Sequence, residues 1–299
     1  MKSVIQSILA IIILSACSAG LSLKNSSSLV QVNAPAGNFL GEGEENFYVF
    51  KGIPYAQPPV GDLRWKAPKN LSAKDEVIDA TKFKSECIQP GTEGLIPNRN
   101  VSVGSEDCLY LNIYIPKNQT DLNKNQFPVM FWIHGGSNIW GSGDFYDFSK
   151  LATTQQVIVV TINYRLGLFG WFSSEHLRNT ATGLDKSSNF GQLDLIKGLE
   201  WVQENISAFG GDKDNITIFG ESAGGHNVLT LLASPLSEGL FHKAISQSGY
   251  VSSYTQKFAE EESELSSKKI FAEETKFLVS DVEVADYLRS LSSEEVYQK

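Results

Sequence analysis

Residues 216–224 read ITIFGESAG, a short apolar run that ends in the pattern G-x-S-x-G around Ser222. Downstream, apolar residues recur at helical intervals at Val228, Leu229, Leu231 and Leu232. A strand, a sharp turn and a helix in this order push a serine hydroxyl out at the carboxyl edge of a sheet. The backbone N–H of Ala223, at the start of the helix, can then face a developing oxyanion. The pattern predicts that Ser222 is a nucleophile; the alternative is a glycine-rich turn with a structural serine.

An earlier apolar run, 128–136, ends in the second half of an oxyanion hole. Residues 132–137 read WIHGGS, and the glycines allow the chain to bend close to a substrate. We therefore expect backbone N–H groups of residues 132–137 to complete the oxyanion hole. His134 is predicted to shape this loop and not to act as a base.

The rest of the chain alternates between apolar runs and helical patterns. Runs at 128–136, 157–164, 216–220 and 243–249 suit strands of a parallel sheet that is covered on both faces. Short strands are expected earlier, at 30–35 and 47–56. Residues 192–206 have the apolar spacing of an amphipathic helix. The charged residues 257–299 are expected to form surface helices or a lid. This order predicts an α/β fold.

The first 29 residues carry an export pattern. Lys2 precedes an apolar run from Ile5 to Leu14, which is too short to span a bilayer. The run ends in Leu14-Ser-Ala-Cys17, which resembles a bacterial lipobox. We expect residues 1–16 to be a signal peptide, Cys17 to carry lipid, and residues 17–29 to form a tether. The expected location is the periplasmic side or the outer membrane. An ordinary signal peptide, with a secreted protein, and an uncleaved anchor are the alternatives.

Net charge and cysteine content bear on the partners, the disulfide and the cofactors that this chain can have. The formal net charge is −9, which argues against a nucleic-acid partner. If Cys17 carries lipid, Cys87 and Cys108 remain as a pair in an oxidising compartment. A disulfide between them would contribute about 3 kcal/mol in the chain-entropy model. Two free buried thiols are the alternative. No His/Cys/Asp cluster has the spacing of metal ligands, so neither a metal nor an organic cofactor is expected.

Several separate motifs resemble one known family. Residues 209–224, FGGDKDNITIFGESAG, are similar to the serine signature of type-B carboxylesterases, and 106–116, EDCLYLNIYIP, to a second signature of that family. Supporting matches lie at 50–65, 160–171, 199–212 and 239–249. The resemblance implies an α/β-hydrolase fold, with a mostly parallel central sheet and helices on both faces. It identifies residues 30–299 as the N-terminal portion of that domain. It also implies that small carboxylic esters are hydrolysed through an acyl-serine.

The resemblance also implies roles for single residues. Ser222 matches the nucleophile, Gly136, Ser137 and Ala223 the oxyanion positions with Gly135 beside them, and Cys87–Cys108 the N-terminal disulfide. Glu221 is implied to lie in a polar network beneath the site, and Ser248 to be a buried polar residue near the triad. Asn163 and Arg165 resemble scaffold residues. The loop between the two cysteines contains no tryptophan, so choline esters are not expected as preferred substrates.

A base for Ser222 is the missing component. The chain has four histidines, His134, His176, His226 and His242. His226 lies one helical turn after Ser222, but we expect it to pack along the helix, and neither His176 nor His242 is expected to be the base. The resemblance places the acid and the histidine after residue 299. We therefore expect the last strands of the sheet to be missing, the chain alone to be inactive or poorly soluble, and a C-terminal fragment to complement it. A non-catalytic surface or adhesion protein on this scaffold and a serine peptidase of the same fold are the alternatives.

Overall fold

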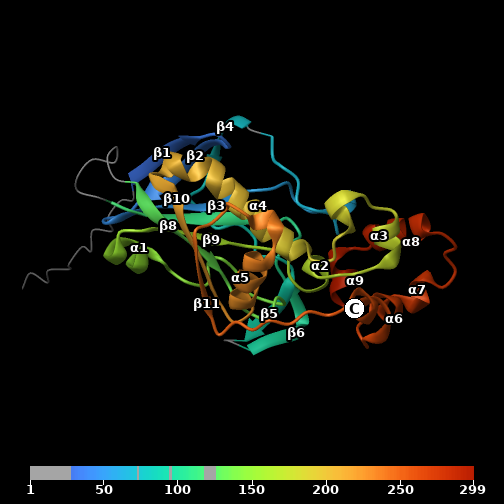
Figure 1. Ribbon diagram of the computed structural model, residues 1–299. Helices are drawn as coiled ribbons and strands as arrows, with labels where there is room; N and C mark the ends of the chain where they lie inside the picture. The colour runs from blue at the N-terminus through green and yellow to red at the C-terminus, as the bar shows by residue number, and fades with distance from the viewer. Residues whose placement is uncertain (1–27, 73, 94–95, 118–125) are drawn as a thin grey trace, which may run out of the picture.

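The computed structural model describes residues 28–72, 74–93, 96–117 and 126–299 (Figure 1). The expected signal peptide (1–16), the lipid site at Cys17 and all but the last two residues of the expected tether (17–29) lie outside these ranges. Residues 28 and 29 belong to the first strand. Within the described residues no helix is both long enough and apolar enough to cross a membrane.

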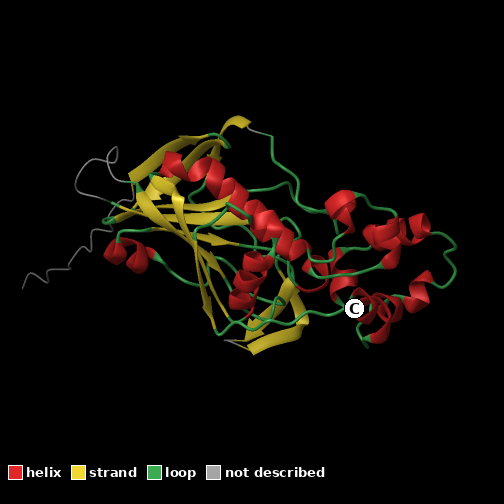
Figure 2. Ribbon diagram, in the orientation of Figure 1, coloured by secondary structure: helices red, strands yellow, loops and turns green. Residues whose placement is uncertain are grey.

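A nine-stranded mixed sheet forms the centre of the described structure (Figure 2). Its strands pair in the order β1-β2-β3-β7-β9-β8-β10-β11, and β4 pairs with β2. Their bounds are β1 Ser28–Ala34, β2 Gly37–Gly43, β3 Phe47–Pro54, β4 Lys74–Asp79, β7 Tyr110–Pro116, β8 Phe127–Ile133, β9 Ile158–Ile162, β10 Gly211–Glu221 and β11 Lys243–Gln247. A separate hairpin joins β5 (Gln89–Glu93) to β6 (Ile96–Val103).

The four apolar runs form one parallel part of this sheet, and β2 and β4 form a second parallel pair. Strands β9, β8, β10 and β11 pair in parallel, whereas β1, β2, β3, β7 and β9 pair antiparallel. The predicted α/β-hydrolase fold is therefore confirmed, with parallel pairing at the strands nearest Ser222. Because parallel strands end at the same edge, the carboxyl ends of β8 and β10 bring Gly135 and Ser222 together.

Alternate residues of the strands pack against helices on opposite faces. Phe131, Val160 and Ile218 lie in the main core with helix α4 (Phe190–Asn205) and helix α5 (Ala223–Ala233). Trp132, Val159 and Phe219 face the other way and pack near helix α1 (Ser149–Gln155). This alternation is the two-residue period of a strand that is covered on both sides.

Helix α4 contains the amphipathic helix expected at 192–206, and the predicted apolar positions are buried. Its buried side also includes the polar residues Asp194 and Asn205, so that twelve of its sixteen residues are buried. The helix approaches the sheet so closely that a Cβ at Gly198 would lie 2.2 Å from Cδ1 of Ile162. Its polar residues have partners inside the protein, since Asn205 Oδ1 accepts a 2.7 Å hydrogen bond from Ala36 N. Apolar spacing alone does not reveal such paired polar groups.

The charged segment after residue 257 forms short surface helices, as expected. They are the π-type turn η5 (Phe258–Glu262), α6 (Ser267–Ile270), α7 (Ala272–Thr275), α8 (Asp281–Ser290) and α9 (Ser293–Tyr297). Together with α2 (Gly167–Gly170) and α3 (Glu175–Asn179), they lie at the right of Figure 1. Capping boxes start α8 and α9. Buried Arg64 fastens the end of α8 by donating to Leu291 O at 2.6 Å, and it also pairs with Glu106.

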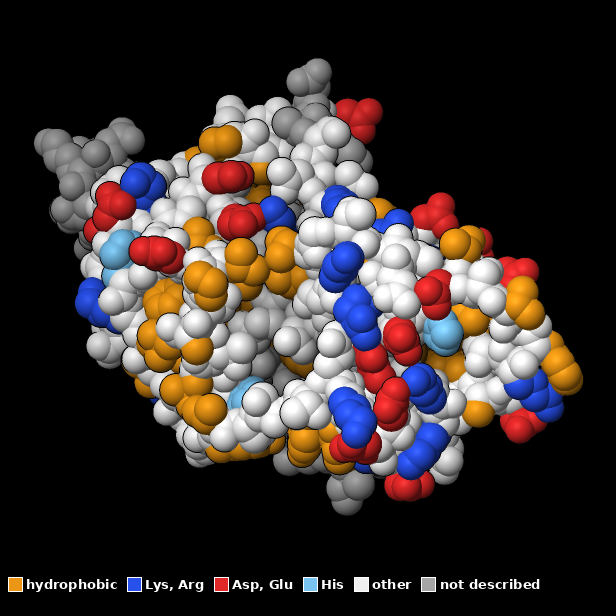
Figure 3. All heavy atoms as spheres, turned by 45° about the vertical axis from the view of Figure 1, so that its right-hand side comes forward, with side chains coloured by type: hydrophobic (Ala, Val, Ile, Leu, Met, Phe, Trp, Pro, Cys, Tyr) orange, Lys and Arg blue, Asp and Glu red, His pale blue; other side chains and the backbone are white. Residues whose placement is uncertain are grey.

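Strand β11 is the edge of the described sheet. It pairs with β10 on one side, and its side chains are largely exposed, including Ile245. Large apolar side chains are also exposed just after it, at Tyr250, Val251 and Tyr254. Figure 3 shows hydrophobic side chains gathered at the left of that view and charged side chains interleaved at the right. An unpaired apolar edge of this kind is a surface on which further polypeptide can add.

Candidate active site

Ser222 lies on a strained turn between β10 and α5. Its backbone angles are φ 55° and ψ −119°, a conformation that residues other than glycine rarely adopt. Two backbone hydrogen bonds hold the turn: Ser222 N donates to Gln247 O of β11, and His226 N donates to Ser222 O, both at 2.9 Å. Gly224 packs on the end of β8, where a Cβ would lie 2.0 Å from Ile133 O. The predicted turn is therefore formed.

The loop after β8 lies directly against this turn. A Cβ added at Gly135 would lie 3.3 Å from Cβ of Ser222 and 2.8 Å from Glu221 O, so only glycine fits there. The three residues that follow, Gly136, Ser137 and Asn138, have φ values of 87°, 57° and 56°. Ala223, at the first position of α5, is buried beside Ser222. The structure thus places Gly135 and Ala223 against Ser222, and Gly136 and Ser137 follow Gly135 in the same loop.

Three side chains that the sequence did not single out fix the position of this loop. Asn227, buried on α5, donates from Nδ2 to Asn138 Oδ1 at 2.8 Å. The Tyr164 hydroxyl donates to His134 O at 2.6 Å. The third is Gln89 of β5, which lies 52 residues before the loop residue that it binds. No local pattern marks any of them, because each acts on a partner that is distant in sequence.

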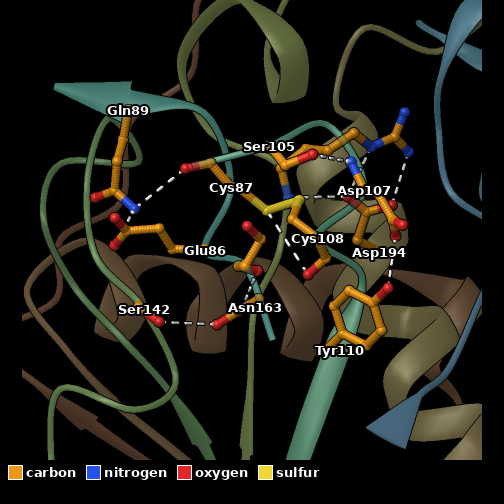
Figure 4. Close-up of a disulfide and its surroundings, with 12 residues drawn as sticks. Glu86, Cys87, Gln89, Ser105, Asp107, Cys108, Tyr110, Ser142, Asn163 and Asp194 are labelled. Atoms are coloured by element: carbon orange, nitrogen blue, oxygen red, sulfur yellow. Dashed lines mark hydrogen bonds and ion pairs between the residues drawn. A yellow bond between two sulfur atoms is a disulfide. The ribbon is translucent and has the colours of Figure 1, made fainter. Parts of the chain in front are cut away.

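Gln89 forms a clamp between the loop that the Cys87–Cys108 disulfide closes and the loop after β8, which runs from His134 through Gly141 and is called the oxyanion loop below. Figure 4 shows Gln89 beside Glu86 and Cys87. Its Oε1 accepts a 2.7 Å hydrogen bond from Gly141 N, and its Nε2 donates to Gly141 O at 3.1 Å. The same Nε2 also lies 3.2 Å from Cys87 O and 3.0 Å from Glu86 Oε2. Cys87 is joined to Cys108 by a disulfide, and both are buried. Through Gln89, a covalently closed loop holds the far end of the oxyanion loop.

Replacing Gln89 with leucine should lower the free energy of unfolding by about 2 kcal/mol. Leucine has a similar size, but it leaves the buried N–H and C=O of Gly141 without partners, which costs about 1–3 kcal/mol. Urea unfolding followed by circular dichroism measures the loss. Gln31→Leu is the matched control, since Gln31 is exposed and bonds only to nearby Asn33. Equal effects of the two replacements would show that Gln89 does not act as a clamp.

His134 is a buried member of the loop and not a base for Ser222. It is 1% exposed, stacks on Tyr164 with ring centroids 4.3 Å apart, and its Nδ1 lies 3.0 Å from Gly135 O. Burial lowers the pKa of His134 from its usual 6.5 to about 4. The imidazole is therefore neutral near pH 7, consistent with the loop-shaping role predicted from the sequence.

The low pKa of His134 predicts a loss of stability in acid. As pH falls below 6.5, His134 becomes protonated in the unfolded chain, whereas in the folded chain it becomes protonated only near pH 4. Stability is therefore complete above the unfolded pKa and is lost as pH falls toward the folded pKa, by about 2 kcal/mol between pH 7 and pH 5. Urea unfolding of the natural chain and of His134→Phe at both pH values measures the contribution of His134 to this loss. If the variant loses as much stability as the natural chain, His134 is not its source.

Comparison with known proteins decides the family. The model of the carboxylesterase family matches residues 28–299. The chain belongs to the carboxylesterase family. It is 47% identical to the para-nitrobenzyl esterase of Bacillus subtilis (strain 168) over 220 residues, which cover 73% of this chain and 43% of that protein. It is 44% identical to carboxylesterase 1E of Rattus norvegicus, covering 75% and 41%.

Solved structures of carboxylesterases have the same fold. A thermophilic PNB esterase superposes with a TM-score of 0.75 at 39% identity, covering 90% of this chain and 52% of the other. A Geobacillus stearothermophilus carboxylesterase gives a TM-score of 0.62 at 43% identity, covering 72% and 42%. The chain thus spans less than half the length of these curated relatives and about half or less of these solved structures.

Within the described ranges no histidine side chain of this carboxylesterase chain hydrogen-bonds the hydroxyl of Ser222. Nδ1 of His226 contacts Tyr250 O, in the segment after β11 and not along α5 as predicted. Ile216 N donates to Nδ1 of His242 at 3.1 Å. His176 pairs with Asp281 at 2.6 Å on the surface between α3 and α8. Each of these three imidazoles is therefore bound to a partner other than the Ser222 hydroxyl.

The two residues expected to support the site are exposed in this carboxylesterase chain. Glu221 is the last residue of β10, and its Oε2 lies beside Gly135, 3.1 Å from where a Cβ of that residue would be, without a hydrogen bond or ion pair to the described residues. Ser248 is exposed at the end of β11 with φ 53°. The polar network and the buried position that the resemblance implies for them are not formed by the part of the chain described here. Both lie at the open side of the site, beside the exposed edge strand.

A buried ion pair supports the strands behind the site. Arg165, 3% exposed, pairs with Asp194, 0% exposed, through bonds of 2.7 and 2.8 Å. Asp194 also accepts from the backbone N–H of Arg165 at 3.0 Å. Asn163 Oδ1 accepts from Gly143 N at 2.7 Å and so ties down the loop after Gly141. These contacts are those of scaffold residues, as expected.

Proposed function

We propose that this chain supplies the nucleophile and the oxyanion hole of a serine carboxylesterase, and that the base and the acid come from polypeptide outside these 299 residues. The observation that carries the proposal is the strained Ser222 turn packed against Gly135, with no histidine side chain hydrogen-bonded to the Ser222 hydroxyl in the described ranges. A positive φ at a serine costs about 1–3 kcal/mol and persists where it serves chemistry. Ordinary turns place glycine there.

The reaction follows from this geometry. Ser222 Oγ attacks the carbonyl carbon of the ester while a histidine base accepts its proton. Backbone N–H groups of Gly136, Ser137 and Ala223 hold the negative oxygen of the tetrahedral intermediate. The intermediate collapses, the base returns the proton to the leaving alcohol, and an acyl-serine remains. Water, deprotonated by the same base, then attacks the acyl carbon and releases the acid.

The exposed edge of the sheet is the reason for proposing that a further segment of polypeptide completes the site. Strand β11 has a free edge, and Ile245, Tyr250 and Val251 are apolar and exposed beside it. Glu221 and Ser248 open onto this same side. The relatives carry more than half of their length beyond the matched part. Polypeptide that adds a strand to β11 covers these side chains and can carry a histidine to Ser222.

A fusion protein tests the proposal. Residues 28–299 are joined to the part of the Bacillus subtilis para-nitrobenzyl esterase that follows the matched region, and hydrolysis of 4-nitrophenyl butyrate is measured. We expect turnover by the fusion and none by the 299-residue chain above its Ser222→Ala background. Ser222-dependent turnover by the chain alone would refute an external base. An inactive but folded fusion would favour a non-catalytic binding protein on this scaffold.

We also propose that the protein is exported and anchored through lipid on Cys17. The support is the sequence Leu14-Ser-Ala-Cys17 after a short apolar run. Labelling of cells with radioactive palmitate should mark the full-length chain and should not mark the Cys17→Ser variant. Equal labelling of both proteins would exclude this anchor.

A further inference from the structure

A pocket of about 350 Å³ opens beside the predicted oxyanion hole. One wall is the oxyanion loop, with Ser137, Ile139 and Trp140, and the other is the β5–β6 hairpin, with Pro90, Pro97 and Arg99. The pocket is large enough for part of a small molecule. Since Ser137 contributes both to this wall and to the expected oxyanion hole, a group in the pocket lies next to the reacting carbonyl.

Four of the six residues that line this pocket have apolar side chains, and the Ser137 hydroxyl and one cation are its polar side chains. Pro90, Pro97, Ile139 and Trp140 supply apolar surface, and Arg99 supplies the charge. The Arg99 side chain is exposed and makes no ion pair with any side chain in the described ranges. The chain as a whole carries a net charge of −9, so it does not attract anions generally. A single free guanidinium in an apolar pocket is a selective site for a carboxylate, which its fork of N–H groups binds in two places.

The hairpin that carries Arg99 is held at both ends. Gln89, the residue before Pro90, is clamped to Gly141 of the oxyanion loop by bonds of 2.7 and 3.1 Å. On the other strand, the Tyr297 hydroxyl of α9 donates to Arg99 O at 3.1 Å, and Ser102 hydrogen-bonds Glu294. The two walls of the pocket are therefore fixed relative to each other, which lowers the entropic cost of binding.

We propose that this pocket receives a carboxylate of the ester, bound by Arg99, so that the preferred substrates are esters with an anionic acyl or alcohol part. The substrate class rests on the proposed function, whereas the binding site stands by itself. The test therefore measures binding without hydrolysis. Failure of the catalytic proposal leaves its outcome unchanged, because Ser222→Ala is expected to bind the ligands equally well.

Three amides, which are hydrolysed far more slowly than the matching esters, serve as ligands. Butyric 4-nitroanilide is neutral, succinic mono-4-nitroanilide carries a carboxylate on the acyl part, and 5-butyramido-2-nitrobenzoate carries one on the part that corresponds to the alcohol. The nitrophenyl group quenches tryptophan fluorescence, and Trp140→Phe shows which part of the signal arises in this pocket. The full 299-residue chain is titrated with each ligand at low and high salt.

We expect one of the two carboxylates to bind about tenfold more tightly than the neutral amide, and the position of its carboxylate shows which part of the ester enters the pocket. Arg99→Ala should remove that preference and leave binding of the neutral amide within twofold. Arg99→Lys should keep part of the preference for the carboxylate. Lys213→Ala removes an exposed lysine that pairs with Asp214, and it should leave binding of all three amides unchanged. Equal binding of all three amides, equal losses in Arg99→Ala, or no binding of any of them would overturn the proposal.

Discussion

Replacing Ser222 with alanine should lower the turnover of 4-nitrophenyl butyrate by the fused enzyme at least about 10³-fold. The hydroxyl on the strained turn is the only proposed nucleophile, and removing one member of a catalytic triad leaves only the effects of binding and the oxyanion hole. KM should change little, because the ester is held by the pocket walls and not by Ser222. Steady-state kinetics of the purified fusion separates the two parameters.

Ser248→Ala is the matched control for this experiment. Ser248 ends β11 with φ 53°, nearly the value at Ser222, and it is also a serine at the open side of the sheet. Its loss should leave kcat within about tenfold, since its implied role is to support the site. If both variants lose activity equally, backbone strain at serine is no guide to the nucleophile in this fold.

Replacing Asp194 with alanine should lower the free energy of unfolding by about 3–5 kcal/mol. Asp194 is completely buried, and its removal leaves the Arg165 guanidinium buried without its counter-charge. The backbone N–H of Arg165 also loses its acceptor. For a domain of marginal stability, such a loss is a large fraction of the total. The shift of the urea midpoint, at constant slope, measures it.

Two further variants test whether burial of the unpaired charge causes the loss of stability in Asp194→Ala. Asp214→Ala breaks the exposed pair with Lys213, and it should cost less than about 1 kcal/mol. Arg165→Met combined with Asp194→Leu removes both charges, so it should recover much of the stability lost in Asp194→Ala. A double variant as unstable as the single one would mean that packing around this pair outweighs the unpaired charge.

Local patterns predicted the part of the fold that surrounds Ser222. The runs that became β8, β9, β10 and β11 are apolar and bounded by turn residues, so both their type and their order could be deduced. The serine turn has glycine where the backbone approaches Ile133 O, and these glycines belong to the G-x-S-x-G pattern in the sequence. Helices α8 and α9 begin with capping boxes that are also visible in the sequence.

The supports of the site could not be deduced in this way. Gln89 meets Gly141 and Asn227 meets Asn138 only after the sheet has formed, and nothing near these residues in sequence marks the contact. The burial of Asp194 within α4 depends likewise on Arg165, which lies 29 residues earlier. The pocket beside Ser137 depends on where the β5–β6 hairpin comes to rest. Each of these features is a relation between distant segments.

The positive φ at Ser222 has a consequence for the evolution of this chain. Glycine adopts that backbone conformation with little strain, so a change to glycine would make the turn easier to form. Mutation followed by selection for folding alone therefore favours glycine at this position. A lineage that still uses the hydroxyl must keep the less stable residue. Serine at 222 is thus the state that a lineage is expected to lose early once catalysis is no longer under selection.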